Sequence, residues 1–304
     1  MSEQAPLRSL LFVPGDSERK QTRALASEAD ALILDLEDSV TPAQLPAARA
    51  RVARLVSSGA PDAAPQLWVR VNAPSGGAFR EDLEAVCRQR MPHGVVLPKI
   101  SAPAEIIEAA DYLTALETRL GLMPPVSRLL VIATETPQGV LALPQYLPVL
   151  GPSRAAARLA GLTWGAEDLG VALGVRDRRD PAGGLTFTFR LARTMCLLTA
   201  AALGVQALDT VHVNFQDASG LEASLGEARR DGFSGKLAIH PDQVTAINVA
   251  FTASEAELEH ARRVVAAFAA SAGAGVASLD GQMIDRPHLL QAQRLLAQAR
   301  HPRR

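Results

Sequence analysis

Short runs of apolar residues recur along the chain, separated by longer segments with helical spacing. Most runs are continuous rather than alternating, which is typical of parallel strands buried on both faces. Repeated strand–helix alternation predicts a parallel sheet. Eight units in 304 residues favour an α/β fold of the (β/α)8 TIM-barrel type over the alternative, a doubly wound open sheet. The expected strands are SLLFV (9–13), ALILDL (31–36), QLWVRV (66–71), GVVLP (94–98), LLVIAT (129–134), GLTWG (161–165), DTVHVN (209–214) and KLAIH (236–240).

The pattern changes after residue 250. A helix is expected at 255–272, followed by a turn at 278–285 with at most a short strand, VASL, and by a last helix rich in Leu and Gln. We therefore divide the chain into a TIM-barrel catalytic domain, residues 1–250, and a C-terminal helical extension, residues 251–304. The extension is expected to pack on the barrel or on a neighbouring subunit.

Composition narrows the function classes. Lys and Arg number 31 against 32 Asp and Glu, and this balance argues against nucleic acid as a partner, because affinity for phosphate backbones comes from excess basic charge. The cysteines, Cys87 and Cys196, form no CxxC motif, so neither a disulfide framework nor a zinc site is expected. No apolar run reaches the roughly 18–20 residues that span a bilayer, and the N-terminal run is too short for a signal peptide. We expect a soluble, cytoplasmic protein that does not bind membranes.

Residues able to do chemistry follow most of the expected strands. A barrel gathers the C-terminal ends of its strands around one pocket, so these residues are expected to share a site. They are Glu37, Asp38, Arg70, Lys99, Glu135 and Asp168.

The two acids after the fifth and sixth strands, Glu135 and Asp168, suggest a metal site. Mg²⁺ prefers oxygen ligands and usually takes only one or two carboxylates, and the lack of a nearby His or Cys disfavours zinc. The alternative is that both acids only favour the N-termini of the following helices. The same alternative applies to Asp38.

Arg70 ends an apolar strand, and its planar guanidinium suits a two-point grip on a substrate carboxylate. The alternative is a salt bridge to Glu37 or Asp38 at the rim. His240 ends the eighth strand, where it is either a base or a hydrogen-bonded packing residue. Asn214 and Asp217, after the seventh strand, are similarly ambiguous.

The chain has only three lysines, Lys20, Lys99 and Lys236. Lys99, at the end of the fourth strand, is a candidate for a Schiff base with a carbonyl substrate. Lys20, near the start of the first helix, is either a phosphate contact or a solvated residue. Lys236 begins the eighth strand, which is the wrong end of a barrel for catalysis.

Several motifs occur in a recognisable order between about residues 7 and 297. Together they resemble the citrate lyase beta subunit-like family, which includes malyl-CoA and citramalyl-CoA lyases. The motifs are RSLLFVPG (8–15), LDLEDSV (34–40), VRVN (69–72), LPKI (97–100), ETPQG (135–139), GAEDL (165–169), FSGKLAIHPDQV (233–244) and GQMIDRPHLLQAQ (281–293).

The resemblance implies a TIM-barrel lyase that splits a 3-hydroxyacyl-CoA thioester into acetyl-CoA and a small keto acid. It also implies Mg²⁺ at Glu135 and Asp168, the keto-acid carboxylate at Arg70, and a homotrimer or homohexamer in which the C-terminal segment of one subunit covers the site of the next. Asp285 matches the family's acid–base residue on that segment.

Further roles are assigned with the resemblance in view. Glu37 and Asp38 are expected to hold metal-bound water or Arg70, and Gly15 and Lys20 are candidate contacts for CoA phosphates, with Lys99 beside the substrate. Two other functions stay open: a malyl-CoA-type thioesterase on the same scaffold, and a citrate lyase beta subunit that acts only within a multi-subunit complex.

Overall fold

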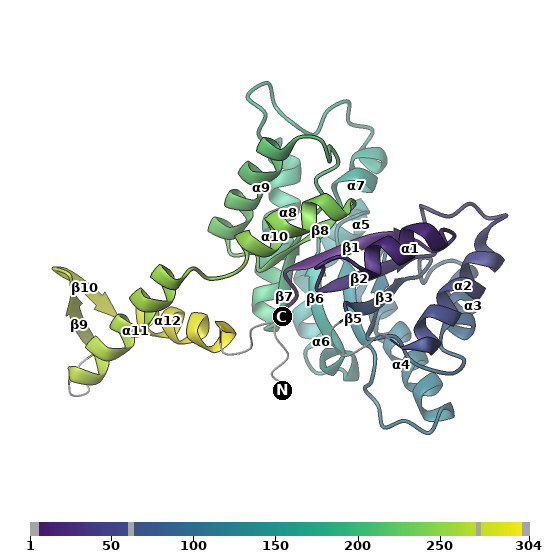
Figure 1. Ribbon diagram of the computed structural model, residues 1–304, viewed down its shortest axis with the longest axis horizontal. Coiled ribbons are helices and arrows are strands. Elements are labelled where there is room, and N and C mark those ends of the chain that lie inside the picture. The colour runs from purple at the N-terminus through teal and green to yellow at the C-terminus, as the bar shows by residue number, and fades with distance from the viewer. Residues whose placement is uncertain (1–5, 60–63, 272–274, 300–304) are drawn as a thin grey trace.

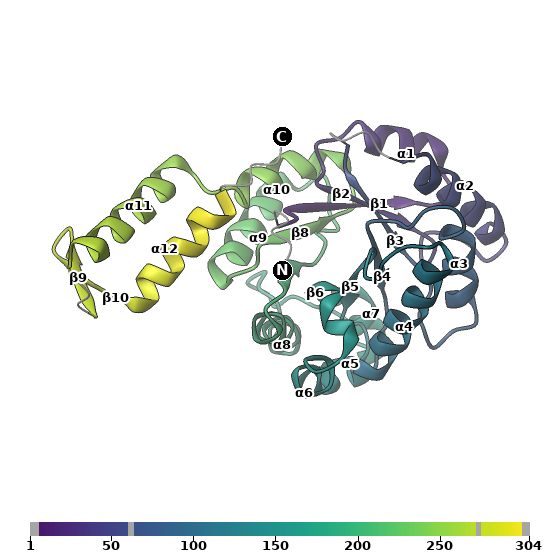
Figure 2. The same cartoon turned by 90° about the horizontal axis from the view of Figure 1, so that it is seen from below.

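The centre of the molecule is a closed barrel of eight parallel strands arranged in sequence order (Figures 1 and 2). The computed structural model describes residues 6–59, 64–271 and 275–299. It confirms the predicted TIM-barrel fold. The strands are β1 (Ser9–Pro14), β2 (Ala31–Asp35), β3 (Gln66–Arg70), β4 (Gly94–Leu97), β5 (Arg128–Ile132), β6 (Leu159–Thr163), β7 (Gln206–Asp209) and β8 (Gly235–Ala238).

Helices surround this barrel on the outside, as Figure 2 shows. Those of the barrel are α1 (Glu18–Leu25), α2 (Leu45–Ser58), α3 (Ala78–Val86), α4 (Pro103–Arg119), α5 (Pro137–Ala142), α6 (Tyr146–Leu150), α7 (Ala166–Leu173), α8 (Phe187–Leu203), α9 (Ala218–Asp231) and α10 (Val244–Ala250), with 3₁₀ turns at Leu143–Gln145, Arg154–Ala157 and Pro241–Gln243.

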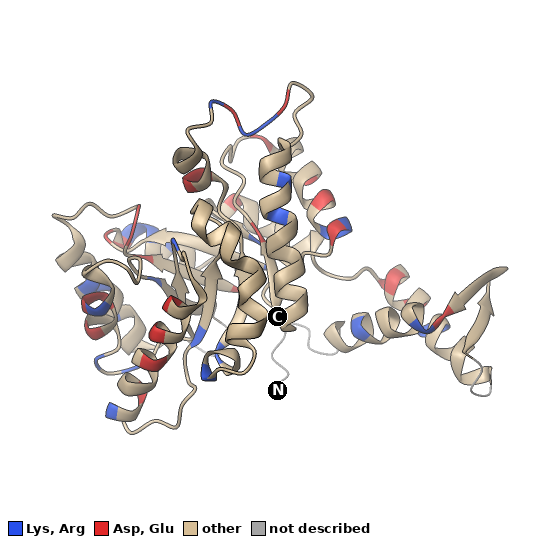
Figure 3. Cartoon of the chain, turned by 180° about the vertical axis from the view of Figure 1, so that it is seen from behind, with Lys and Arg blue, Asp and Glu red and all other residues tan. Residues whose placement is uncertain are grey.

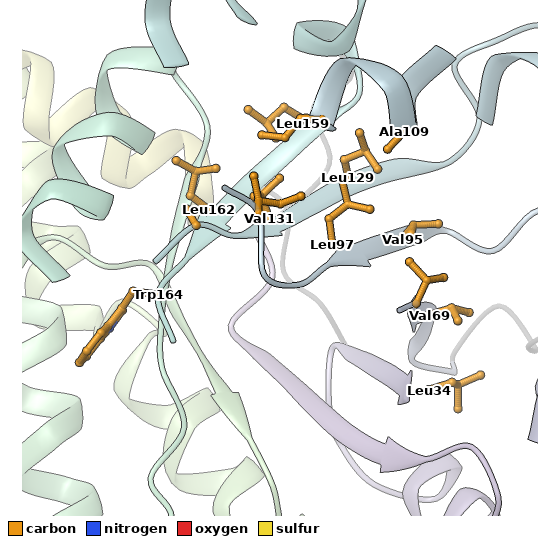
Figure 4. Close-up of a cluster of buried hydrophobic side chains, with 14 of the residues drawn as sticks. Leu34, Val69, Val95, Leu97, Ala109, Leu129, Val131, Leu159, Leu162 and Trp164 are labelled. Carbon is orange, nitrogen blue, oxygen red and sulfur yellow. The ribbon is translucent and has the colours of Figure 1, made fainter. Parts of the chain in front are cut away.

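Successive side chains of each strand point to opposite faces, and both faces are buried. One set fills the barrel, with residues such as Ile33, Trp68 and Leu130. The other set, which includes Leu34 and Val69, packs outward against the helices (Figure 4). Burial on both faces explains why the strands read as continuous apolar runs.

The seventh strand differs from the prediction. We expected residues 209–214, but the strand is Gln206–Asp209. Asp209 points outward and pairs with Lys236 of β8, Nζ to Oδ2 at 2.6 Å, and with Arg193 of α8 at 3.2 Å. The apolar alternation of Val211 and Val213 continues past the strand end, which is why it misled the prediction.

The C-terminal segment forms a separate arm that projects from the barrel (Figures 1 and 2). It consists of α11 (Glu255–Ala270), a hairpin of β9 (Val276–Leu279) and β10 (Gln282–Asp285), and α12 (Arg286–Ala299). The arm has its own small apolar cluster, which includes Val264 and Ile284. An ion pair of 2.7 Å between Arg229 and Glu257 connects α9 to α11.

Strand β10 was not predicted. The turn that makes the hairpin is Asp280-Gly281, and both residues have positive φ, 51° and 76°. Positive φ at two central residues is the geometry of a tight hairpin turn, for which Asp-Gly is a preferred sequence. That dipeptide was the available signal.

Charges of both signs are scattered over the helices and occur together in the loop between α7 and α8 (Figure 3). Among the described helices, none combines the length and apolar character that a bilayer-spanning segment needs. The cytoplasmic location and the absence of nucleic-acid partners stay predictions.

A buried ion pair supports the N-terminal end of the barrel. Arg158 contacts both carboxylate oxygens of Glu117, at 2.7 and 2.6 Å, and Glu117 also accepts the N–H groups of Val126 and Ser127. Burial acts to raise the pKa of Glu117, but these hydrogen bonds and the charge of Arg158 outweigh it and hold the pKa below its usual range.

We predict that Glu117→Gln lowers the free energy of unfolding by about 3–5 kcal/mol, because Arg158 is left buried without a counter-charge. The matched control is Glu84→Gln, since Glu84 forms an exposed pair with Arg119 at 2.9 Å, and its loss should cost less than about 1 kcal/mol. Urea unfolding measures both.

The contribution of Glu117 to the free energy of unfolding also depends on pH. Its folded pKa is depressed, so the stabilisation is present above the unfolded value of about 4.3 and is lost as pH falls through the folded value. The gap between wild type and Glu117→Gln should therefore narrow below about pH 4. Equal losses in the two variants at neutral pH contradict this account.

Candidate active site

An arginine–aspartate pair lies at the C-terminal end of the barrel interior. Asp35 and Arg70 are register partners on β2 and β3, and alternation points both side chains inward after Ile33 and Trp68. The contact is two-pronged, with Nε to Oδ1 at 2.6 Å and Nη2 to Oδ2 at 2.7 Å. Burial acts to raise the pKa of Asp35, but Arg70 overcomes this and lowers it. Sequence reasoning missed Asp35, although its inward register was a usable signal.

Lys99 connects the acids beside this pair. Its Nζ contacts Glu37 and lies 2.9 Å from Asp38 Oδ1 and 3.8 Å from Asp168 Oδ1. Burial acts to lower the pKa of Lys99, yet its acidic partners raise it above the usual range. A Schiff-base lysine needs a depressed pKa, so the structure argues against that role.

Glu135 follows the neighbouring strand β5 and is buried, and its Oε2 accepts the backbone N–H of Lys99 at 2.6 Å. Lys99 adopts a left-handed backbone, φ 53°, a conformation that is uncommon outside glycine. Burial raises the pKa of Glu135 to about 8; the Lys99 hydrogen bond opposes this rise, and the charges of Glu37 and Asp168 add to it.

The charge of the cluster fits a divalent cation. The cluster contains two basic side chains, Arg70 and Lys99, and five carboxylates. When all seven groups are ionised, its net charge is therefore −3. The carboxylates are Asp35, Glu37, Asp38, Glu135 and Asp168. Among the described residues, no three His, Cys, Asp or Glu side chains are arranged as a ready-made metal site, and a site that uses only one or two carboxylates suits Mg²⁺ better than zinc.

The helix-capping alternatives are now distinguishable. Thr136, not Glu135, caps α5 by accepting the Gly139 N–H at 2.9 Å. Asp38 precedes no helix directly, since α2 begins at Leu45. Asp168 lies in the first turn of α7 and also borders the cluster. The salt-bridge alternative for Arg70 is present geometrically, because Nη1 lies 2.9 Å from Glu37 Oε2.

The cluster opens into a cavity of about 780 Å³ at this end of the barrel. Arg70, Glu135 and Asp168 line it, and Lys20 of α1 lines its outer wall. Gly15 does not line the cavity. Its backbone N–H donates to the Asp35 carbonyl at 2.8 Å, and a Cβ there would lie 2.5 Å from that oxygen. Close approach of β1 to β2 therefore requires glycine.

Other predicted residues lie apart from the cluster. Asp285, on β10 of the arm, contacts His288 at 2.5 Å and is not brought to the cavity of its own chain (Figure 1). His240 stacks on Phe215 with ring centroids 4.9 Å apart, and its Nδ1 accepts the Asp242 N–H. Asp217 caps α9, and no contact of Asn214 with the cluster is observed among the described residues.

Comparison with known proteins shows the family. A model of the HpcH/HpaI aldolase/citrate lyase family matches residues 8–241. Human mitochondrial citramalyl-CoA lyase is 32% identical over 301 residues, covering 95% of this chain and 84% of its own length. A (3S)-malyl-CoA thioesterase from Cereibacter sphaeroides (strain ATCC 17023) is 35% identical over 302 residues, with coverages of 98% and 97%.

A solved structure agrees along nearly the whole chain. Protein CitE from Mycobacterium tuberculosis, in complex with magnesium, acetoacetate and coenzyme A, aligns with a TM-score of 0.75 at 33% identity, covering 98% of this chain and 99% of that one. Barrel, acidic cavity and relatives together define a TIM-barrel lyase. The chain belongs to the HpcH/HpaI aldolase/citrate lyase family, and the resemblance noted from its motifs is confirmed.

We predict that sodium borohydride, added with pyruvate, traps no adduct on Lys99. Its ammonium is held in the charged form by Glu37 and Asp38, and only the free amine attacks a carbonyl. Mass spectrometry of the peptide that contains Lys99 is the measurement, with a Schiff-base aldolase treated in parallel as the positive control. A reduced pyruvyl adduct on Lys99 would contradict the assignment.

Proposed function

We propose that the protein is a Mg²⁺-dependent carbon–carbon lyase that splits a 3-hydroxyacyl-CoA thioester of the citramalyl-CoA, malyl-CoA or citryl-CoA type. The products are acetyl-CoA and a 2-keto acid. The observation that carries the proposal is one cavity that holds an aspartate-anchored arginine beside two acids suited to a metal, Glu135 and Asp168. The names of the relatives, which include citramalyl-CoA lyase, support the same chemistry.

Glu135 and Asp168 would hold the metal, since their carboxylates add to the excess negative charge of the cluster. When bound, Mg²⁺ supplies Lewis-acid stabilisation of negative charge on the substrate oxygens. Lys99 fixes Glu135 through its backbone N–H and holds Glu37 and Asp38 through its ammonium. Glu37 and Asp38 therefore serve as positioning residues for Arg70 and for water at the metal.

Arg70 orients the keto-acid carboxylate. Asp35 occupies its Nε and Nη2, whereas Nη1 makes an ion pair but no hydrogen bond with Glu37. The N–H groups of Nη1 are thus available to a substrate carboxylate. When Arg70 holds the carboxylate in one position, the carbon–carbon bond that breaks is kept in the correct orientation, which lowers the barrier to cleavage.

The cleavage step moves two electron pairs. A carboxylate of the site accepts the proton of the substrate hydroxyl, the O–H electron pair forms the C=O bond of the ketone, and the carbon–carbon bond breaks with its electron pair left on the acetyl carbon. This enolate then needs a proton at carbon. We assign that proton to Asp285 of a neighbouring copy, because Asp285 matches the acid–base residue of the resembled family and does not line the cavity of its own chain.

Exposed apolar surface supports such an assembly, a homotrimer or homohexamer. Val171 of α7 is 82% exposed, Phe187 and Leu198 of α8 are 70% and 63% exposed, and Met283 of the arm is 73% exposed. Covering side chains as exposed as these removes apolar surface from water, which favours association. Both the barrel and the arm carry such side chains.

The wall formed by α1 suits the phosphates of CoA. Arg19, Lys20 and Arg23 all line the cavity there and are exposed. These cations lie at the solvent side, beyond Arg70, as expected for a thioester whose acyl end enters first. The proposed phosphate contact at Lys20 thus has two basic neighbours.

Two further functions have specific support. One relative is a (3S)-malyl-CoA thioesterase, which favours hydrolysis on this scaffold. Others are citrate lyase subunit beta-like proteins of Mycobacterium tuberculosis, which favours a subunit that serves a carrier-bound thioester.

We predict that the purified protein with Mg²⁺ converts at least one of these CoA thioesters into acetyl-CoA and keto acid. EDTA should abolish the activity and Mg²⁺ should restore it, because the acids alone repel the developing negative charge. Glu135→Gln should lower kcat at least about hundredfold. Chromatography of the CoA products, with an NADH-coupled keto-acid assay, provides the measurement.

The same assay separates the alternatives. Free CoA with the intact hydroxy acid indicates a thioesterase. Activity that appears only when an acyl-carrier subunit is added indicates a complex-bound beta subunit. Full activity in chelator contradicts the metal assignment.

We predict that Asp285→Ala and Arg70→Ala are each inactive but complement one another when their subunits are mixed. A site with an intact barrel from one chain and an intact arm from another should form about one quarter of the time in random oligomers. Activity of the mixed sample, against each variant alone, is the measurement. Asp285→Ala should still bind Mg²⁺ and keto acid, because its side chain lies outside the cluster. Failure of verified mixed oligomers to recover turnover would disprove a shared site.

A further inference from the structure

We propose that His288 relays protons between solvent and Asp285, and so restores the proton that Asp285 gives to the acetyl carbon in each cleavage. This inference rests on the proposed lyase function, in which Asp285 serves the site of a neighbouring copy. It adds a residue to that reaction, and it follows from the contact between the two side chains and from their position on the arm.

Local sequence brings the two side chains together. Strand β10 ends at Asp285, and α12 begins at the next residue, Arg286. Pro287 follows in the first helical turn, where its missing N–H group costs no helical hydrogen bond. Residues three apart lie on the same side of a helix, so His288 faces Asp285. Its Nδ1 lies 2.5 Å from Asp285 Oδ1 and accepts the backbone N–H of Asp285 at 3.2 Å.

A contact of this length requires a proton between the two atoms. An ionised carboxylate oxygen and a bare ring nitrogen both present lone pairs, and these would repel each other at 2.5 Å. The pair therefore shares one proton, either as a carboxylate with an imidazolium or as a carboxylic acid with a neutral imidazole. Because the proton of such a coupled pair belongs to both groups, the imidazolium protonates the carboxylate in a single transfer along one hydrogen bond.

The proposed cleavage needs such a relay because its two proton transfers occur on different chains. A carboxylate of the barrel site takes the proton of the substrate hydroxyl, whereas Asp285 of the neighbouring copy gives a proton to carbon. Each turnover therefore leaves the barrel carboxylate with one proton in excess and Asp285 one proton short. The excess proton returns to solvent, and His288 takes a proton from water or from a buffer acid and passes it to Asp285. Protons then balance over the cycle.

The imidazole is placed to exchange protons with water. Its side chain is 53% exposed, and that of Asp285 is 44% exposed. An exposed ring reorients within nanoseconds, far faster than typical enzyme turnover. Among the described residues, the ion pair of Asp285 is with His288 alone, since Arg263 pairs with Asp280 at the turn of the hairpin. His288 is therefore the titratable group in contact with this carboxylate.

A structural role of His288 has to be separated from the relay. His288 is the third residue of α12, and by accepting the N–H of Asp285 it completes one half of a capping box. Glutamine is a preferred residue for that hydrogen bond, but its amide does not titrate. His288→Gln thus retains the cap and removes the relay. His260 of α11 is also exposed, so His260→Gln is the matched control for the loss of an imidazole from the arm.

The test compares steady-state turnover in weak buffer with a single turnover at excess enzyme, for the thioester that the Mg²⁺-loaded wild type cleaves fastest. Rapid quenching and chromatography of acetyl-CoA measure both. We expect His288→Gln to lower kcat at least about tenfold, with KM within about threefold, because each cycle waits for Asp285 to regain its proton. The single turnover should keep its rate within about threefold, since its proton is already in place. Added imidazole should restore kcat, and His260→Gln should behave as wild type.

Other results overturn the relay. A wild-type kcat of His288→Gln in weak buffer shows that Asp285 regains its proton without the imidazole. Equal losses in the single turnover and the steady state, without recovery in imidazole, indicate a structural role only. Both outcomes leave the lyase function intact, whereas cleavage of none of the thioesters by wild type overturns that function itself. A single turnover of Asp285→Ala as fast as that of wild type overturns the assignment of Asp285.

Discussion

The in-register contact between Asp35 and Arg70 is the constraint on which the site depends. A guanidinium inside a barrel is unfavourable unless an anion meets it, and here neighbouring strands deliver that anion at the same level with two hydrogen bonds. The contact also directs the remaining donors of Arg70 toward the cavity. Since both residues lie on strands, their positions are as rigid as the barrel, and the loop acids are arranged around a fixed cation.

A second set of charged residues lies outside the barrel and has a structural role, unlike the charged residues of the candidate site inside it. Lys236, Arg193 and Asp209 meet between the outer face of β7–β8 and the helices α8 and α9. Asp209 and Lys236 are each one residue out of phase with the inward Leu208 and Leu237, so they face outward and meet Arg193 of α8. These ion pairs therefore hold helices to the barrel. Lys236, although one of three lysines, therefore belongs to packing, as its place at the start of β8 had indicated.

Much of the fold was predictable from sequence, because burial on both faces makes each strand a continuous apolar run. The strand predictions were wrong where the apolar run is weak, or where it continues past the end of the strand. The short segment QALD reads poorly as a strand, whereas the apolar residues after it extend past the sheet. Strand β10 lies on an exposed hairpin with little burial, and only its Asp-Gly turn signals it. The clustering of Glu37, Arg70, Lys99 and Glu135 followed from strand order. Asp35 was missed because attention went to the residues that follow the strands, whereas Asp35 is the last residue of β2 and pairs with Arg70 across the sheet.

One segment of chain touches both extremes of the cavity. Phe12 on β1 forms part of its floor, and Lys20 on α1 reaches its solvent side. The turn between them is pinned, since the Gln21 side chain donates to the carbonyl of Gly15 at 3.0 Å and Gly15 is wedged against β2. The pinned turn thus fixes the distance between the floor and the solvent side of the cavity. That distance determines how long a ligand must be to contact both Phe12 and Lys20. Inserting or deleting residues in this turn would change the length of ligand that can touch both ends, without altering either end.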